Sequence, residues 1–304
     1  MDKIGIVVVT YNRQTMLKEN VESLRRQCYT HRDIVVIDNG STDGTSEWLA
    51  SQKDLIVITQ ANLGGAGGFF TGLKYVAEHG YDYCWCMDDD VICQPNTLSE
   101  LVNAAKKLED GKWGFLCSSV FDKKGNPTNV PDIDLRAIES DPDWPRYLDE
   151  GMVKVRFASF VSVFVPTKNI HDYGLPLRDF FIWGDDTEYT TRLSDHLPCY
   201  LVGKSEVKHM REMTQGLSFL EETNPHRLKL YFYMFRNQYY LASHGYWHKR
   251  LPRLRFLVTK SMLLGKALLS FKTQHVQVLI KAIWKAPWFN TIIEYPQSKR
   301  KNEI

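Results

Sequence analysis

The sequence predicts a doubly wound α/β sheet followed by a basic helical C-terminal region. In the first ninety residues, short apolar runs rich in β-branched residues alternate with segments of helical spacing, as expected for βαβ units. Polar residues follow the end of each apolar run. From His226 onward the sequence becomes helical, aromatic and basic. We therefore divide the chain into two regions, residues 1–225 and residues 226–304.

Composition places the chain among ordinary globular proteins. It has 304 residues, of which 43% are apolar and 24% charged, so a disordered or fibrous chain is excluded. Six cysteines are too few for a disulfide scaffold, and we expect reduced thiols in a cytosolic protein. Cys84 and Cys86 are expected on opposite faces of one strand. We find no run of about 18 uncharged apolar residues, and Ile4–Val9 is too short for a signal-peptide core.

The net charge of +2 hides an asymmetry between the two regions. Residues 1–225 carry 23 basic and 34 acidic residues, a net charge of −11. Residues 226–304 carry 15 basic and 2 acidic residues, a net charge of +13. An acidic body is thus joined to a strongly basic tail.

The expected strands are the apolar runs, and Ile4–Val9 is typical of a strand buried on both faces of a parallel sheet. The other expected strands are Asp33–Asp38, Leu55–Thr59, Tyr81–Met87, Gly114–Phe121, Val153–Val165 and Ser205–His209. The expected helices lie around Met16–Leu24 and Trp48–Leu49, and at Phe69–His79, Pro95–Leu108 and Asp185–Leu193. Ala61–Gly68 is expected to be a glycine-rich loop, and residues 122–152 an irregular excursion or lid.

The predicted ligand site lies where the strands end, because ligands of such sheets bind outside the carboxyl ends of the strands. Those ends carry Thr10-Tyr11-Asn12, Asp38-Asn39, Ala61-Asn62 and Asp88-Asp89-Asp90. Three adjacent carboxylates repel one another unless a cation neutralises them, and oxygen ligands of this kind suit Mg²⁺ or Mn²⁺. A solvated acidic turn is the alternative for this triplet.

Three further features are ambiguous by themselves. The glycines of Asn62–Gly68 let a backbone approach a bound anion, but a flexible connection explains them as well. Asp185 and Asp186 at a helix start could be catalytic carboxylates or ordinary capping residues. A lone histidine such as His209 is more often structural than a metal ligand.

Taken together, these motifs resemble the inverting glycosyltransferases of family 2, which have the GT-A fold and use nucleotide-sugar donors. The resemblance rests on Val8–Arg13, Val36–Gly44, the Asn62-Leu-Gly-Gly motif, the aspartate triplet and the Gly-Asp-Asp helix start, in that order. Within the family, Asn62–Phe69 and Phe181–Asp186 look most like bacterial galactofuranosyltransferases, with rhamnosyltransferases close.

The resemblance implies roles for particular residues. Asp88 and Asp90 would hold Mn²⁺ or Mg²⁺ on the diphosphate, with His209 as a further ligand. Asp186 would be the general base, with Asp185 as the competing choice, because many family members carry Glu where this chain has Asp185. The donor site would comprise Thr10, Tyr11, Arg13, Asp38, Asn62, Gly65, Asp89 and Trp183.

We therefore expect a metal-dependent transferase that moves galactofuranose from its UDP donor onto a bacterial cell-surface glycan or a lipid-linked acceptor. A rhamnosyltransferase using dTDP-rhamnose is the close alternative. A sugar-phosphate nucleotidyltransferase would need a basic glycine-rich loop near the N-terminus, which Val8–Arg13 does not provide. A non-enzymatic glycan- or membrane-binding module would leave both acidic clusters unexplained.

The basic, aromatic tail fits an anionic membrane surface better than nucleic acid, with a solvated surface as the third possibility. We accordingly expect a cytoplasmic protein that is peripheral on the inner face of the cell membrane and does not bind nucleic acid.

Overall fold

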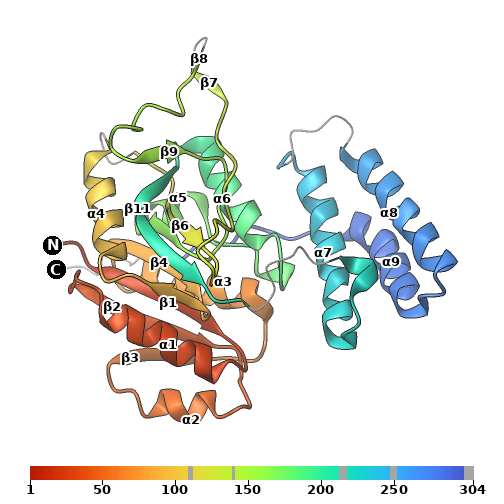
Figure 1. The fold of residues 1–304 in the computed structure, drawn as a ribbon, viewed down its shortest axis with the longest axis horizontal. Coiled ribbons are helices and arrows are strands. Elements are labelled where there is room, and N and C mark those ends of the chain that lie inside the picture. Colours follow the sequence, from red (N-terminus) through yellow and green to blue (C-terminus); the bar gives the residue numbers. More distant parts are fainter. Residues whose placement is uncertain (109–111, 139–140, 212–217, 247–251, 298–304) are drawn as a thin grey trace.

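The computed structural model describes residues 1–108, 112–138, 141–211, 218–246 and 252–297. Figure 1 shows a central sheet with helices on both sides, and a separate group of C-terminal helices beside it. The strands of the main sheet are β1 (Ile4–Thr10), β2 (Arg32–Asp38), β3 (Leu55–Thr59), β4 (Tyr83–Asp88), β5 (Val91–Cys93), β6 (Leu116–Phe121), β9 (Met152–Lys154), β10 (Val163–Pro166) and β11 (Tyr200–His209). Two short strands, β7 (Ala137–Ile138) and β8 (Asp141–Pro142), pair with each other within the irregular 122–152 segment.

The helices beside the sheet are α1 (Gln14–Arg25), α2 (Thr45–Ala50), α3 (Gly64–Glu78), α4 (Thr97–Lys107), α5 (Thr167–Tyr173) and α6 (Asp185–His196). The C-terminal helices are α7 (Pro225–Ser243), α8 (Pro252–Leu269) and α9 (Thr273–Lys285). Single 3₁₀ turns occur at Arg178–Phe180, Phe219–Glu221 and Ala286–Trp288.

The strand order is β3-β2-β1-β4-β10-β6-β11-β5, and β9 also pairs with β11. The first four strands are mutually parallel, as the alternating sequence pattern predicts. The remainder is mixed, because β10 runs antiparallel between β4 and β6. The prediction of one strand over Val153–Val165 is wrong, since β9 and β10 occupy separate places in the sheet and the chain must cross between them.

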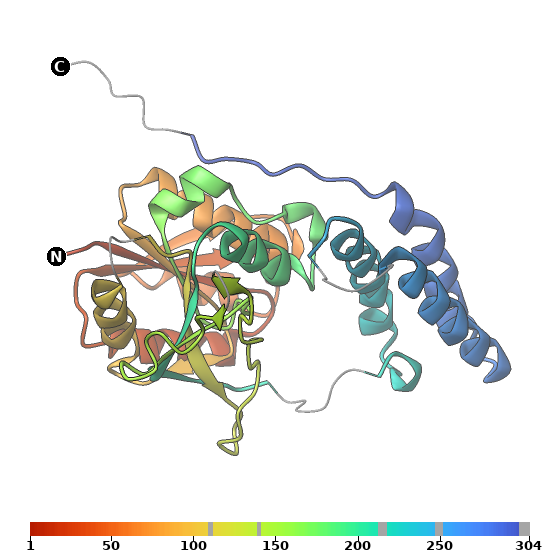
Figure 2. The same cartoon turned by 90° about the horizontal axis from the view of Figure 1, so that it is seen from above.

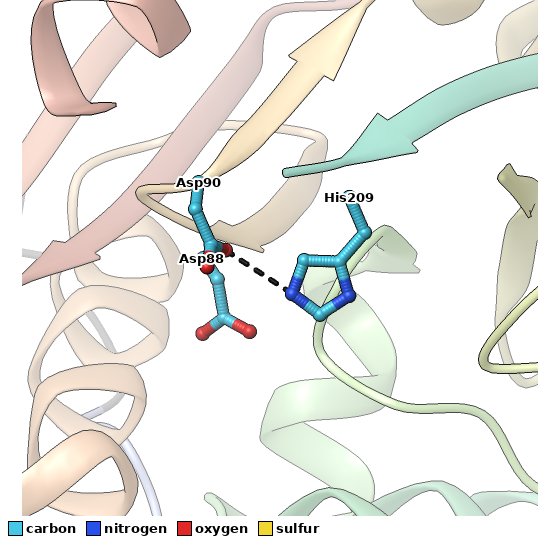
Figure 3. A group of neighbouring side chains, drawn as sticks. All are labelled: Asp88, Asp90 and His209. Atoms are coloured by element: carbon cyan, nitrogen blue, oxygen red, sulfur yellow. Dashed lines mark ion pairs between the residues drawn. The ribbon is translucent and has the colours of Figure 1, made fainter. Parts of the chain in front are cut away.

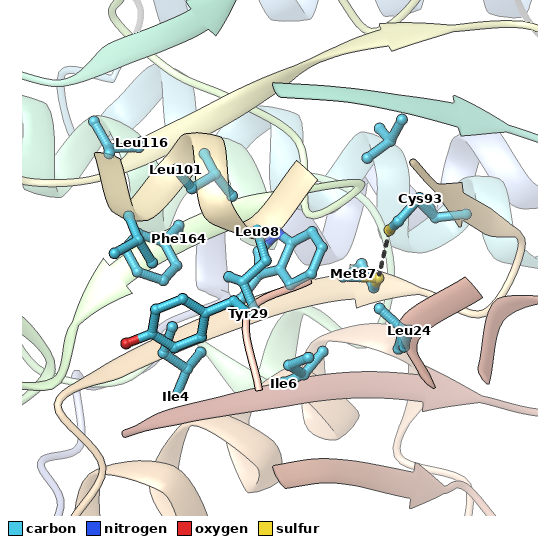
Figure 4. Close-up of a cluster of buried hydrophobic side chains, with 14 of the residues drawn as sticks. Ile4, Ile6, Leu24, Tyr29, Met87, Cys93, Leu98, Leu101, Leu116 and Phe164 are labelled. Atoms are coloured by element: carbon cyan, nitrogen blue, oxygen red, sulfur yellow. Dashed lines mark hydrogen bonds between the residues drawn. The ribbon is translucent and has the colours of Figure 1, made fainter. Parts of the chain in front are cut away.

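Two apolar layers cover the sheet, so the doubly wound prediction is confirmed. On one face, Ile4, Ile6 and Val8 of β1 pack with the apolar sides of α1, α2 and α4. Figure 4 shows part of this cluster, which includes Leu24, Leu98 and Leu101. On the other face, the alternate residues of β1 pack with α3, α5 and α6.

The glycine-rich segment is helical rather than a loop, because α3 begins at Gly64 and not near Phe69. Its glycines allow the helix to lie directly on the sheet. A Cβ atom at Gly68 would come within 2.3 Å of Val9 Cγ1, and one at Gly72 within 2.2 Å of Val7 Cγ1. Gly68, one of the glycines that suggested a loop, is therefore a contact position between α3 and β1, as is Gly72 further along the helix.

The six cysteines are free thiols, as expected. Cys84 and Cys86 lie in the same core layer, so the expectation of opposite faces is wrong. Residues two apart in a strand point to the same side of the sheet.

The C-terminal helices form their own apolar cluster, in which α7 packs against α8 and α9. After α9 the chain returns along the first region as an extended segment, visible in Figure 2. There Glu294 O accepts a hydrogen bond from Leu175 N at 2.8 Å. No helix in the described part of the chain is long and apolar enough to cross a membrane.

Candidate active site

The site lies at a topological switch point of the sheet. The chain passes from β1 to its neighbour β2 through α1, which lies on one face of the sheet. The other neighbour of β1 is β4, which the chain reaches through α3 on the opposite face. Thr10 and Asp38 are register partners at the ends of β1 and β2, and Asp88 ends β4. Ligands of open α/β sheets bind at such a point.

Asp88, Asp90 and His209 form a group with the composition of a metal site (Figure 3). One ligand atom from each side chain lies within 4.8 Å of the others. The chain reverses after Asp90 into β5, which pairs antiparallel with β11, so that Val91 is the register partner of His209. Met210 N also donates a hydrogen bond to Asp90 O at 2.8 Å. This antiparallel pairing places a histidine beside an acidic turn more than 100 residues away in sequence.

Hydrogen bonding orients the His209 ring. Its Nδ1 lies 3.0 Å from Asn129 Oδ1, and this amide oxygen can only accept a hydrogen bond. A neutral imidazole therefore carries its proton on Nδ1 and its lone pair on Nε2. That nitrogen lies 3.2 Å from Asp90 Oδ1, a buried atom that has no hydrogen-bond donor among the described residues.

His209 Nε2 and Asp90 Oδ1 both offer lone pairs at this distance, so a proton or a cation must lie between them. The ligand atoms of this group therefore fit a divalent ion. The farthest ligand atoms of one octahedral Mg²⁺ or Mn²⁺ lie about 4.2 Å apart, so small side-chain movements would suffice. Carboxylates with one imidazole suit Mn²⁺ as well as Mg²⁺.

Arg13 connects the end of β1 to the acidic triplet. Its Nη1 donates to Asp90 Oδ2 at 2.8 Å and lies 3.4 Å from Asp89 Oδ1. Thr10 Oγ1 donates to Asp89 Oδ2 at 2.7 Å. Asp89 is buried against β1 by these contacts, which leaves Asp88 and Asp90 as the two carboxylates of the metal group.

Burial and neighbouring charges separate the pKa values of the three aspartates. Burial, together with the charges of Asp90 and Asp89, raises the pKa of Asp88 well above its ordinary value. Burial also raises the pKa of Asp89, to about 6, against the opposing charge of Arg13. At Asp90 the effect of burial is outweighed by His209, where its ring carries the second proton, and by Arg13, and both lower the pKa. A bound cation would favour the charged form of all three.

Asp185 and Asp186 begin α6, and Gly184, with φ of 95°, is the residue before them. Asp185 is buried, with 6% of its surface exposed, whereas Asp186 is partly exposed. Burial raises the pKa of both carboxyl groups, most strongly that of Asp185, where the charge of Asp186 adds to it. The charge of Asp186 also raises the pKa of Asp88, so the acidic helix start lies within electrostatic reach of the metal group.

The other predicted donor residues lie around the same strand ends in different environments. Tyr11 is exposed, and Asp38 is fully buried, with its carboxylate accepting from Ser41 N and Ser46 Oγ inside its own loop. Asn62 is exposed and caps the turn into α3 by accepting from Gly64 N at 2.9 Å. A Cβ atom at Gly65 would meet nothing within 4 Å. The Trp183 ring lies 5.6 Å from that of Tyr231 on α7. Binding of a donor by these residues stays a prediction.

Sequence reasoning missed Asn129, which orients His209, and the contacts of α7 with the segment before Asp185. Asn129 lies inside the irregular 122–152 segment and has φ of 47°, a conformation that Asn adopts more readily than most residues. No sequence signal marks it as a neighbour of His209.

Comparison with protein-family models matches residues 5–153 to the model described as glycosyl transferase family 2. Galactofuranosyltransferase GlfT1 of Mycobacterium tuberculosis is 31% identical over 111 residues, which is 35% of this chain and 36% of the relative. The undecaprenyl-phosphate mannosyltransferase of Micrococcus luteus is 30% identical over 112 residues, covering 35% of this chain and 46% of the relative. The matched part thus spans less than half the length of either relative.

Solved structures share the fold at low sequence identity. TarS of S. aureus, residues 1–349, superposes with a TM-score of 0.59 and 15% identity over 93% of this chain and 80% of that chain. The same protein in complex with UDP-GlcNAc superposes with a TM-score of 0.57 and 14% identity, over 93% of this chain and 81% of that chain. GalNAc-T7 with UDP, GalNAc and Mn²⁺ superposes with a TM-score of 0.56 and 15% identity, over 84% of this chain and 54% of that chain. The fold of this chain is therefore the GT-A fold.

Proposed function

We propose that this chain, whose residues 5–153 match the model described as glycosyl transferase family 2, transfers a sugar from a nucleotide donor to an acceptor hydroxyl with inversion. The observation that carries the proposal is the shared site of two acidic groups from distant parts of the chain. Asp88 and Asp90 form one acidic group with His209, and the charge of Asp186 raises the pKa of Asp88. Transfer with inversion needs one group for the leaving diphosphate and another for the acceptor proton.

Asp186 is the proposed base. It is partly exposed and has a pKa raised by burial, so it can receive the acceptor proton as the hydroxyl oxygen attacks the anomeric carbon. Asp185 is buried and therefore less accessible to an acceptor. Asp88, Asp90 and His209 would hold Mn²⁺ or Mg²⁺, which supplies positive charge to the departing diphosphate. Asn129 holds the His209 ring in the orientation this requires.

We propose UDP-galactofuranose as the donor and a bacterial cell-surface glycan or lipid-linked glycan as the acceptor. The name of the M. tuberculosis relative supports the sugar, and the name of the M. luteus relative supports a lipid-linked substrate. A rhamnosyltransferase using dTDP-rhamnose is the competing assignment.

Calorimetry and product analysis test this function. We expect UDP to bind more tightly with Mn²⁺ than without, and Asp90→Asn and His209→Ala to weaken that metal-supported binding. A preference for nucleoside triphosphates would instead indicate a nucleotidyltransferase, and no nucleotide binding would indicate a non-enzymatic module. Incubation with a panel of nucleotide sugars and glycan acceptors then identifies the donor. Exclusive transfer of rhamnose would refute galactofuranose and leave the family intact.

We further propose that the protein binds the inner face of the cytoplasmic membrane peripherally through α8. Leu254, Val258, Met262 and Leu269 are spaced by four, four and seven residues, so they follow one face of the helix, and all are exposed. Exposed Arg255 and Lys266 accompany this apolar stripe. An apolar stripe with basic neighbours, in a region of net charge +13, complements an anionic lipid surface.

A further inference from the structure

We propose that Arg236 and Asn237 of α7 are positioning residues that hold the segment before the acidic helix start, and so place Asp186 for proton transfer. The inference rests on the proposed function for the role of Asp186. It assigns the C-terminal region a part in the active site in addition to any role at a membrane.

The segment from Asp179 to Gly184 has an unusual backbone. Phe181 and Trp183 have φ of 64° and 63°, which residues with a side chain rarely adopt, and Gly184 has φ of 95°. Asp185 and Asp186 follow immediately. Such a conformation persists only where the surroundings hold it.

The side chain of Asn237 provides much of that support. Its Nδ2 lies 2.9 Å from Phe180 O, 3.0 Å from Ile182 O and 2.8 Å from Trp183 O. Its Oδ1 accepts from Arg236 Nε at 3.0 Å and Nη2 at 2.9 Å. The amide group is thus fixed by three acceptors on one side and a guanidinium on the other. Asn237 is 1% exposed, so water does not substitute for these contacts.

Arg236 extends the same contact by one residue. Its Nη2 donates to Asp179 O at 2.6 Å and to Phe180 O at 3.2 Å. The guanidinium lies 3.7 Å from the centre of the Phe289 ring, which belongs to the returning C-terminal segment. Helix α7 and the chain end therefore converge on the same few peptide groups.

Other contacts tie this segment to both regions of the chain. Phe181 O accepts from Ala66 N of α3 at 3.1 Å, and Thr291 Oγ1 donates to Asp179 Oδ2 at 2.7 Å. One turn into α6, Glu188 accepts from Tyr246 Oη, just beyond α7, at 2.6 Å. The start of α6 is therefore placed by the C-terminal region as well as by the sheet.

The metal group depends on different contacts. Asp88, Asp90 and His209 are placed by β4, β5 and β11, and none of the hydrogen bonds given above connects them to α7. Loss of the Asn237 amide should therefore misplace the base and leave metal binding intact. A displacement of about 1 Å from a residue outside the chemistry can cost on the order of 100-fold in turnover.

The test compares the full-length Asn237→Ala, Arg236→Lys and Leu228→Ala proteins. Leu228 is buried on α7 within the cluster that α7 forms with α8 and α9, so Leu228→Ala controls for lost stability. We expect kcat of Asn237→Ala to fall about 100-fold, with Mn²⁺ affinity and the stoichiometry of UDP binding unchanged. The acid limb of its kcat–pH profile should move to lower pH, because a less buried Asp186 has a lower pKa. Arg236→Lys should show the same changes to a smaller degree.

Deuterium exchange over residues 179–188 provides a readout independent of activity. We expect faster exchange there in Asn237→Ala and no local change in Leu228→Ala. Unchanged kcat and exchange in Asn237→Ala would overturn the proposal. So would kcat losses that follow the loss of Tm or of UDP-binding sites equally in all three variants. If the parent protein transfers no sugar, the proposed function fails, and the exchange comparison still decides whether α7 holds this segment.

Discussion

Asp88, Asp89 and Asp90 are consecutive in sequence but differ in surroundings. Asp89 is held by Thr10 and Arg13, whereas Asp90 faces both Arg13 and His209. Asp88 is grouped with Asp90 and His209 and lies near enough to Asp186 for the two charges to interact. Asp88 and Asp90 are therefore the two carboxylates available to a cation, whereas Asp89 between them is turned toward β1.

Exchange of Asp186 for Asn removes the proton acceptor while keeping the shape of the side chain. We expect Asp186→Asn to retain Mn²⁺-supported UDP binding and to lose transfer by about 10²- to 10⁴-fold, the usual contribution of a general base. Calorimetry and initial rates with the same acceptor measure the two effects. A fully active Asp186→Asn protein would place the base elsewhere, with Asp185 as the first residue to test.

Removal of the Asn129 side chain should weaken metal binding through His209. Gly is the informative replacement, because it tolerates the φ of 47° that would strain Ala. We expect Asn129→Gly to cost about 10- to 100-fold in Mn²⁺ affinity, as is usual for partners of metal-bound histidines. Ser159→Ala is the control, since Ser159 contacts the Nδ2 end of the same amide at 3.1 Å. Equal Mn²⁺ affinities of Asn129→Gly and the parent protein would mean that the His209 ring needs no such partner.

At the scale of elements, helix α3 reaches the sheet through its glycines. A methyl group at Gly72 would lie 2.2 Å from Val7 Cγ1, and the branched Val7 side chain is fully buried in the central strand. We expect Gly72→Ala to lower the free energy of unfolding by about 1–3 kcal/mol, because overpacking outweighs the gain in helix propensity.

Gly265 on α8 is a matched control, since a Cβ atom there would meet nothing within 4 Å. Gly265→Ala should raise the free energy of unfolding by about 0.5–1 kcal/mol. Denaturant unfolding of both variants measures the difference. A stabilised Gly72→Ala protein would show that α3 can move away from β1 without loss.

At the scale of the whole molecule, charge and exposed apolar surface are separated along the chain. If α8 docks on lipid, Val258→Glu with Met262→Glu should weaken binding to anionic vesicles at least tenfold, because each change removes about 1.5 kcal/mol or more of apolar burial. Binding of the parent protein should also fall as salt rises. Sedimentation of the full chain with vesicles measures both.

The matched control for lipid binding carries the same charge change on the acidic region. Val130 and Leu135 are 64% and 65% exposed, so Val130→Glu with Leu135→Glu adds two charges without removing core contacts. We expect this control to bind vesicles like the parent protein. Equal weakening in both pairs would show that net charge alone acts, and salt-insensitive binding would contradict the electrostatic part.

The sequence by itself determined the parallel half of the sheet and the edge where the site lies. Continuous apolar runs such as Ile4–Val9 are typical of central strands of a parallel sheet. The polar residues that follow each of these strands then lie at the same edge of the sheet. The acidic triplet and the Gly-Asp-Asp helix start were therefore recognisable before the fold was known. Local pattern carried that information.

Only the tertiary structure decided which distant residues complete the site. The β5–β11 pairing brings His209 to Asp90, and Asn129 contacts the imidazole from an irregular segment. Asn237 donates hydrogen bonds to the peptide groups before Asp185. The same holds for Gly68 and Gly72 of α3, which allow the helix to lie close to β1. These features arise from contacts between segments far apart in the chain, and such contacts leave no periodicity or spacing in the sequence from which they could be predicted.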